Sequence, residues 1–159
     1  MIAIDTRTAG ANLRPALSTD LPGIEQLLTA SGLPLSGVAE TLPGFVVAEH
    51  EGVIVGTAAL EACCDTALLR SVAVAPGWRS RGLGRALVSR VIAEAEARGI
   101  RALYLLTMTA EHYFPSFGFQ PIARDQVPTE VRATEEFRSA CPASAVVMCR
   151  PCMPKLERP

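Results

Sequence analysis

The pattern of apolar and polar positions along the chain predicts alternating strands and helices. Six apolar runs have the length of strands: residues 13–16, 45–50, 52–62, 67–74, 102–107 and 144–149. Two other segments have helical spacing, with apolar residues recurring every three or four positions. The first begins at Leu21 and ends before Gly32, and the second runs from Gly82 to Arg98.

The order of these elements predicts a mixed sheet. The second and third apolar runs meet at Glu51-Gly52, a tight-turn pair, and so predict an antiparallel hairpin. A helix connects the run 67–74 to the run 102–107, and a crossover of this kind makes the two strands parallel. We therefore expect an α/β (α+β) fold with a mixed, mostly antiparallel sheet and helices on both faces.

The segments between these runs are less regular. Residues 34–44 hold two prolines and two glycines and predict a loop that includes one helical turn. Residues 110–117 predict a short helix that Pro115 limits or bends, and residues 118–124 lead into a further strand. The stretch 125–143 is polar.

Length and charge narrow the class of protein. The chain has 159 residues, which suits a single domain over 1–159, and we expect residues 1–11 and 151–159 to form loose tails. The net charge of −1 argues against nucleic acid or an anionic membrane as a partner. No apolar run reaches the ~18 residues of a membrane span, and the N-terminus lacks a secretory pattern. These features predict a cytoplasmic protein.

Five cysteines predict free thiols, because the number is odd and the N-terminus carries no export signal. Cys149 and Cys152 form a CxxC pair without a second pair or a nearby histidine, so packing is favoured over a zinc site. Cys63 and Cys64 are adjacent. They would hold a thiophilic ion together only if the chain turns between them.

The stretch VAVAPGWRSRGLGRALV, residues 72–88, places a basic and glycine-spaced loop between a strand and a helix. Gly82 and Gly84 let the backbone approach another group, at a helix start where unpaired N–H groups favour negative charge. Arg79, Arg81 and Arg85 add positive charge. The pattern predicts a phosphate or pyrophosphate site, although neither the P-loop nor the dinucleotide fingerprint is present.

Val74, Arg79, Gly82 and Gly84 together resemble the acetyl-CoA signature of the GNAT superfamily of N-acetyltransferases. The order of elements around the signature is also similar, up to the pair Gly118-Phe119, so the resemblance covers nearly the whole chain. It implies an acetyl-CoA-dependent acyltransferase that needs no metal. It also implies that the parallel strands splay apart and that the pantetheine arm of acetyl-CoA lies in the gap.

The resemblance assigns the residues that hold acetyl-CoA. The pantetheine arm would pair with the backbone of the strand end, and the pyrophosphate would lie on the basic loop. The residues implied are Val72, Ala73, Val74, Arg79, Arg81, Gly82, Leu83, Gly84, Arg85 and, at the position of a frequent asparagine, Thr107.

At the position of the general acid, this chain departs from the family pattern. Many members carry a tyrosine four residues before the glycine of the Gly-Phe pair, and Phe114 occupies that position here. Tyr113 lies one residue earlier, about 100° away on a helix. Either Pro115 turns Tyr113 inward or no tyrosine acts as the acid. Our assignment of the acid is Tyr113.

The strand 67–74 contains no carboxylate that could act as the general base. Candidates elsewhere are Glu49, Glu61 and Glu111, and a chain of water molecules is the alternative. We assign Glu111 together with Tyr113 to the catalytic residues.

Two segments indicate a subfamily. LLTMTAEHYFPSFGFQPIARDQVP is similar to the acetyltransferase domain of bacterial N-acetylglutamate synthases, which also lack the tyrosine. EEFRSACPASAVVM resembles small N-acetyltransferases linked to arsenic-resistance operons, which are thought to act on amino-acid-like compounds such as arsinothricin or phosphinothricin. Both resemblances imply an amino-acid-like amine as the substrate.

An acidic substrate needs cationic or polar partners. Arg70 lies within an otherwise apolar strand and needs a carboxylate partner, either the substrate or an internal group such as Asp65 or Glu111. Arg138 precedes the last strand, and Ser71 can donate a hydrogen bond. We assign Arg70, Ser71 and Arg138 to the substrate site.

Three hypotheses follow. The leading one is acetylation of the α-amine of a small acidic amino-acid-like substrate, as in detoxification of arsinothricin or phosphinothricin. The second is a short N-acetylglutamate synthase. The third is a non-catalytic acyl-CoA-binding protein or a thiol-based metalloid sensor that uses Cys63 and Cys64. The expected partners are the small-molecule amine and, by the resemblance, a second copy of the chain in a homodimer.

Overall fold

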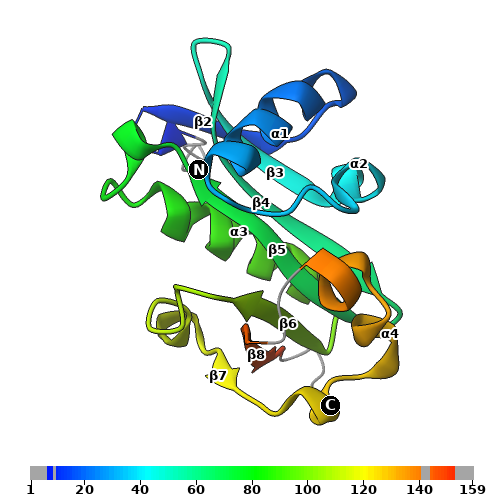
Figure 1. The fold of residues 1–159 in the computed structure, drawn as a ribbon. Helices are drawn as coiled ribbons and strands as arrows, with labels where there is room; N and C mark the ends of the chain where they lie inside the picture. The colour runs from blue at the N-terminus through cyan, green and yellow to red at the C-terminus, as the bar shows by residue number, and fades with distance from the viewer. Residues whose placement is uncertain (1–6, 9, 141–143, 153–159) are drawn as a thin grey trace. The chain divides into compact units, whose positions relative to one another are not determined.

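A computed structural model describes residues 7–8, 10–140 and 144–152 (Figure 1). The chain forms two compact units, Met1–Ala59 with Ser71–Val91, and Leu60–Arg70 with Ile92–Pro159. Strand β4 (Val53–Cys63), strand β5 (Thr66–Val74) and helix α3 (Leu83–Ala97) each contribute residues to both units, because the boundaries between the units fall within these three elements.

The first unit holds strands in the order β1-β2-β3-β4-β5, where β1 is Arg7–Thr8, β2 is Ala11–Pro15 and β3 is Phe45–His50. The pairs from β1 to β4 are antiparallel. Glu51 and Gly52 have φ of 51° and 81°, the left-handed geometry that a tight hairpin turn requires. The hairpin expected at this pair is therefore confirmed. The helical elements are η1 (Ser18–Asp20), α1 (Leu21–Ala30), α2 (Val38–Thr41), η2 (Leu42–Gly44) and η3 (Pro76–Trp78).

Side chains from both faces of this sheet are buried. On one face, helix α1 contributes apolar side chains to a core with β3, formed by Ile24, Leu27, Leu28, Val38, Phe45, Val47, Ala59 and Ala73. On the other face, α3 lies very close to β4. A Cβ built on Gly56 would lie 2.8 Å from Leu87 Cδ1 and 3.4 Å from Leu83 Cδ2. The absence of a side chain at Gly56 therefore allows this close approach.

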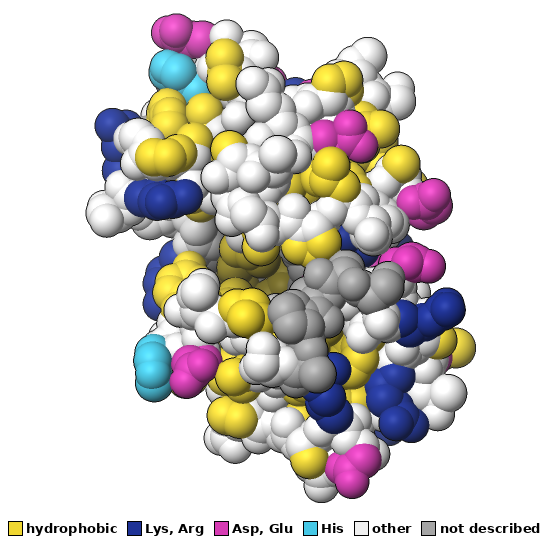
Figure 2. Space-filling model, in the orientation of Figure 1, with side chains coloured by type: hydrophobic (Ala, Val, Ile, Leu, Met, Phe, Trp, Pro, Cys, Tyr) yellow, Lys and Arg dark blue, Asp and Glu magenta, His cyan; other side chains and the backbone are white. Residues whose placement is uncertain are grey.

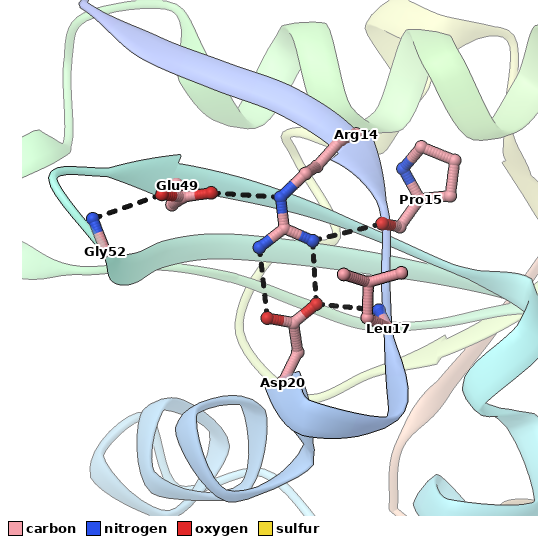
Figure 3. Close-up of polar contacts among 6 residues, drawn as sticks. All are labelled: Arg14, Pro15, Leu17, Asp20, Glu49 and Gly52. Atoms are coloured by element: carbon pink, nitrogen blue, oxygen red, sulfur yellow. Dashed lines mark hydrogen bonds and ion pairs between the residues drawn. The ribbon is translucent and has the colours of Figure 1, made fainter.

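An ion-pair network connects β2, the entry to α1 and the β3–β4 hairpin (Figure 3). Arg14 donates to both oxygens of the Asp20 carboxylate, at 2.7 and 3.0 Å, and through Nε to Glu49 Oε1 at 3.0 Å. The two carboxylates also accept hydrogen bonds from the backbone N–H groups of Leu17 and Gly52, respectively. Hydrogen bonding from Arg14 lowers the pKa of Asp20, so the network prefers the charged carboxylate.

The second unit holds strands in the order β4-β5-β6-β8-β7, where β6 is Ala102–Thr107, β7 is Gln120–Pro121 and β8 is Val146–Pro151. Strands β5 and β6 are parallel, with pairing at Ala67–Leu103 and Leu68–Tyr104, as the crossover helix predicted. The β6–β8 and β7–β8 pairs are antiparallel. The helical elements are η4 (Phe114–Phe117), η5 (Arg124–Gln126), α4 (Thr129–Arg132) and the π-helical turn η6 (Glu136–Ala140).

The expected α/β fold is confirmed, with a mostly antiparallel sheet, one parallel pair and helices. Residues 110–117 form only a 3₁₀ helix from Phe114, because Pro115 cannot donate a helical hydrogen bond. The polar stretch 125–143 contains α4 and η6, to which the sequence pattern assigned no element. Val127, Val131 and Phe137 from this stretch are buried in the second unit's core.

Some residues expected in loose tails belong to the sheet. Arg7–Thr8 pairs with β2, which begins at Ala11, and Pro151 ends β8. The N–H of Cys152 donates to the carbonyl of Arg101 at 2.8 Å. Among the helices that the structure describes, none is both long and apolar enough to cross a membrane.

Candidate functional site

The loop between β5 and α3, in the first unit, has an unusual backbone. Ser80 and Gly82 flank Arg81 and have φ of 65° and 82°, both in the left-handed region. Alternation of left- and right-handed residues turns successive N–H groups toward one side and forms a concavity that binds anions. Helix α3 begins directly afterwards at Leu83, so its unpaired N–H groups lie at the same end of the loop.

Three arginines surround this backbone. The side chains of Arg79, Arg81 and Arg85 are exposed, and Figure 2 shows basic side chains on the surface where Figure 1 draws the loop. Arg79 Nε donates to the carbonyl of Val74 at 3.0 Å, and the Arg81 guanidinium lies 4.8 Å from the centroid of the Trp78 ring. A Cβ built on Gly82 would meet nothing within 4 Å, so this backbone is open to a ligand. The loop therefore fits a phosphate or pyrophosphate group.

The end of β5 leads into this loop and has an irregular backbone of its own. Ser71 is buried and has φ of 59°, a left-handed conformation that a non-glycine residue rarely adopts within a strand. Its carbonyl accepts a hydrogen bond from the Thr57 hydroxyl at 2.7 Å. Ala73 is buried in the core of the first unit, whereas Val72 and Val74 are only half-buried. Residues that strain a strand in this way are often found at functional sites.

In the second unit, Arg70 has two internal carboxylate partners. Its side chain is fully buried, with Nη1 3.1 Å from Glu61 Oε1 and Nε 3.3 Å from Glu136 Oε1. Asp65 and Glu111 were the expected internal partners, and that prediction is wrong. Asp65 Oδ2 pairs with Arg101 Nη1 at 2.9 Å, and Glu111 Oε2 lies 3.7 Å from His112 Nε2.

Glu136 is the residue of this cluster that the sequence did not indicate. Its side chain is 6% exposed, against 24% for Glu61. Burial raises the pKa of the Glu136 carboxyl from 4.5 to about 7, with Arg70 opposing the shift and Glu61 adding to it. One guanidinium is thus shared by two carboxylates, of which Glu136 is the more deeply buried.

The assigned catalytic residues also lie in the second unit. Tyr113 precedes η4 and is 37% exposed. Its ring is edge-on to the rings of Phe114 and Phe117, with centroids 5.2 and 5.3 Å apart. Phe114, at the family's tyrosine position, is buried against Phe119. The Glu111 side chain is 44% exposed. The roles of Tyr113 and Glu111 stay predictions.

Thr107 is buried, whereas Arg138 is exposed. Thr107 ends β6, and its hydroxyl accepts a hydrogen bond from the N–H of Ala110 at 2.9 Å, which orders the following turn. Arg138 lies exposed on η6. The assignments of Thr107 to acetyl-CoA and of Arg138 and Ser71 to the substrate stay predictions.

Cys63 lies next to the Arg70 cluster, because its thiol donates to the carbonyl of Glu61 at 3.5 Å, and Cys141 lies outside the described residues. Cys64 has φ of 63°, so the chain turns after Cys63. Burial raises the pKa of the Cys63 thiol to about 11, and it also raises the pKa values of Cys149 and Cys152. These three thiols are therefore protonated at neutral pH. No group of three or more metal-ligating side chains occurs within residues 7–8, 10–140 and 144–152.

Comparisons with known proteins identify the family of the chain. Residues 42–121 match the acetyltransferase (GNAT) domain family. An amino-acid acetyltransferase of Ectopseudomonas mendocina is 32% identical over 126 residues, which cover 74% of this chain and 29% of that protein. An amino-acid acetyltransferase of Azotobacter vinelandii is 34% identical over 125 residues, which cover 73% of this chain and 29% of that protein. The chain thus spans less than a third of the length of these curated relatives.

Solved structures share the fold over most of the chain. N-acetylglutamate synthase from Neisseria gonorrhoeae, complexed with coenzyme A and N-acetyl-glutamate, superposes with a TM-score of 0.77 at 26% identity, covering 90% of this chain and 35% of that one. A Mycobacterium tuberculosis protein in complex with CoA and NLQ has a TM-score of 0.76 at 26% identity. In that case the match covers 89% of this chain and 99% of the other.

Proposed function

We propose, because the chain belongs to the GNAT acetyltransferase family, that it transfers the acetyl group of acetyl-CoA to the α-amine of a small acidic amino acid. The similarity to amino-acid acetyltransferases over three quarters of the chain is the observation that carries the substrate class. It is supported by neighbours solved with CoA, one of them together with N-acetyl-glutamate.

The loop between β5 and α3 is the proposed site for the phosphates of acetyl-CoA. Its left-handed residues Ser80 and Gly82 orient backbone N–H groups, and the arginines supply charge for the same anion. The pantetheine arm would pair with the backbone of Val72 to Val74, which the half-buried Val72 and Val74 leave near the surface.

The reaction in this proposal is direct. The neutral amine nitrogen attacks the thioester carbonyl, a C–N bond forms, the C–S bond breaks, and the amine's proton must leave while the CoA thiolate gains one. Glu111 is proposed as the base and Tyr113 as the acid. Both side chains are partly exposed, so both can exchange protons with solvent. A thiol pKa of ~8.5 makes the thiolate a fair leaving group, so an acid aids the reaction without being required.

Recognition of an acidic side chain is proposed for the arginines of the second unit. Arg138 is exposed and so is accessible to a carboxylate, phosphinate or arsinate group. Arg70 is fully buried between Glu61 and Glu136. A substrate anion would reach Arg70 only by replacing one of these glutamates, so we rank Arg138 first.

The function is tested by measuring CoA release from acetyl-CoA with a panel of amines. The panel contains glutamate, aspartate, neutral amino acids, phosphinothricin and arsinothricin. Turnover of the acidic compounds, with little turnover of neutral amino acids, is the expected result. Arg138→Gln should then raise KM for the acidic substrate and leave the KM for acetyl-CoA unchanged.

The same panel separates the two candidate roles. Turnover of phosphinothricin or arsinothricin above glutamate assigns the chain to detoxification. Turnover of glutamate above these analogues assigns it to N-acetylglutamate synthesis, the second candidate, which the structural likeness to N-acetylglutamate synthase favours. Binding of acetyl-CoA without turnover of any amine would contradict the substrate class and support a non-catalytic acyl-CoA-binding role.

A further inference from the structure

Trp78 is the single tryptophan of the chain and lies in η3, at the start of the basic loop. Three groups of the first unit surround its indole ring. The centroid of the His50 ring lies 4.9 Å from that of the indole, and the two rings are tilted by 56°. A Cβ built on Gly10 would lie 3.7 Å from Cη2 of the indole. The Arg81 guanidinium lies over the ring, 4.8 Å from its centroid. Trp78 is thus packed against His50 and Gly10, and the Arg81 guanidinium lies over its ring.

The contact between Arg81 and Trp78 is a cation–π interaction, for which tryptophan is the best aromatic partner. Arginine side chains have many rotamers, and fixing one of them when a ligand binds costs free energy. A guanidinium that already lies against a ring loses less freedom on binding a phosphate. A guanidinium that stacks on a ring also keeps the N–H donors along its edge for a phosphate.

The position of Arg81 makes this contact relevant to anion binding. Arg81 lies between Ser80 and Gly82, the two left-handed residues of the loop, whereas Arg79 is held by the carbonyl of Val74. A purely structural role for Trp78 would need an apolar side chain of suitable size. The contact with Arg81 needs an aromatic face.

We propose that Trp78 is a positioning residue for the phosphates of CoA, because it holds the Arg81 guanidinium in place before the ligand arrives. The inference rests on the proposed function only in that it takes CoA as the ligand. It assigns to Trp78 a role in ligand affinity that acts through Arg81.

A double-mutant cycle tests the proposal. The dissociation constant of CoA is measured by calorimetry for the unsubstituted chain and for the variants Trp78→Leu, Arg81→Gln and the double variant. Trp78→Leu should weaken binding about two- to fivefold, the scale of an exposed cation–π contact. In the Arg81→Gln background it should cost nothing further. An equal loss in both backgrounds would overturn the proposal, because Trp78 would then act independently of Arg81.

Two controls separate this role from general effects. Trp78→Phe keeps an aromatic face and should retain CoA affinity within about twofold. Arg90→Gln removes an exposed charge from α3, in the same unit, and should leave CoA affinity unchanged. Weakening by Arg90→Gln as large as that by Arg81→Gln would mean that net charge alone matters, and it would contradict the proposal.

The fluorescence of the unsubstituted indole gives a measurement that does not depend on the folding of the Trp78 variants. All tryptophan emission comes from Trp78, so Arg81→Gln should shift the emission of the free chain, and CoA should change the emission less in this variant than in the unsubstituted chain. Identical emission with and without Arg81 would overturn the proposal. If the unsubstituted chain does not bind CoA at all, the proposed function falls with it; if it binds CoA but the cycle shows no coupling, only the role of Trp78 falls.

Discussion

Arg70 and its two glutamates show how burial alters the chemistry of single residues. The side chains of Arg70 and Glu136 are buried, and that of Glu61 is 24% exposed. A buried charge is tolerated only when it is paired, and one guanidinium cannot neutralise two carboxylates. Burial therefore raises the pKa of the Glu136 carboxyl, Arg70 opposes the rise, and the charge of the more exposed Glu61 adds to it.

The sign of the Glu136 shift predicts how stability depends on pH. The folded chain holds the Glu136 proton up to about pH 7, whereas an unfolded chain releases it near 4.5. The contribution of Glu136 to stability is therefore fully present below pH 4.5 and is lost as the pH rises to about 7. In denaturant titrations, Glu136→Gln should remove this decline, because glutamine does not ionise.

Glu40→Gln is the matched control, since Glu40 is an exposed glutamate on α2. It should leave the decline between pH 4.5 and about 7 as in the unsubstituted chain. If Glu136→Gln shows the same pH profile as the unsubstituted chain, the ion pair with Arg70 keeps Glu136 charged and the raised pKa is wrong.

At the scale of elements, the close approach of α3 to β4 in the first unit depends on a missing side chain. A Cβ at Gly56 would lie 2.8 Å from the end of the Leu87 side chain and 3.4 Å from the Ala48 Cβ. The face of β4 that bears Gly56 therefore accepts a helix whose leucines are fully buried. Sheets and helices pack at close range where small residues meet large ones.

Gly56→Val should destabilise the chain by about 1–3 kcal/mol, because overpacking forces the Leu87 side chain to move. Urea denaturation measures the change. Gly77→Val is the control, since a Cβ at Gly77 meets nothing within 4 Å. Leu87→Ala in the Gly56→Val background should recover part of the loss, and a purely additive result would mean that the two positions do not compete for space.

At the scale of the whole molecule, ligand binding should raise the free energy of unfolding. The chain is nearly neutral, with a net charge of −1, so its affinity for an anion depends on local charge and backbone geometry at the loop. Acetyl-CoA at 100 times its Kd should raise the free energy of unfolding by about 2.7 kcal/mol. Thermal denaturation with increasing acetyl-CoA measures this shift.

Gly82→Trp should abolish the shift, because an indole would fill the space above the open backbone of the loop. The control is Gly32→Trp, since Gly32 also has a left-handed φ, 73° against 82°, and open space around it. Both variants carry similar backbone strain, so they should lose similar stability without ligand. A full acetyl-CoA shift in Gly82→Trp would remove the loop from the cofactor site.

The sequence by itself determined much of the fold and the position of the basic, glycine-spaced loop. Strand β6 matches the expected residues 102–107, and β3 matches residues 45–50, because apolar runs bounded by turn residues are local signals. The basic, glycine-spaced loop was also evident from residue types, since backbone freedom and charge at adjacent positions are local features of the sequence. The short helical elements α4 and η6 were missed, because segments of four or five residues are too short to show a period.

Only the tertiary structure decided which side chains meet. Glu136 is 66 positions after Arg70, and its sequence context is a polar stretch that looks solvated, yet it is buried and bonded to that arginine. Likewise the ring of Trp78 lies against His50 and Gly10, from distant parts of the chain. Contacts between residues far apart in sequence depend on how elements pack, and packing arises from the whole core. Neither local pattern nor residue type determines them.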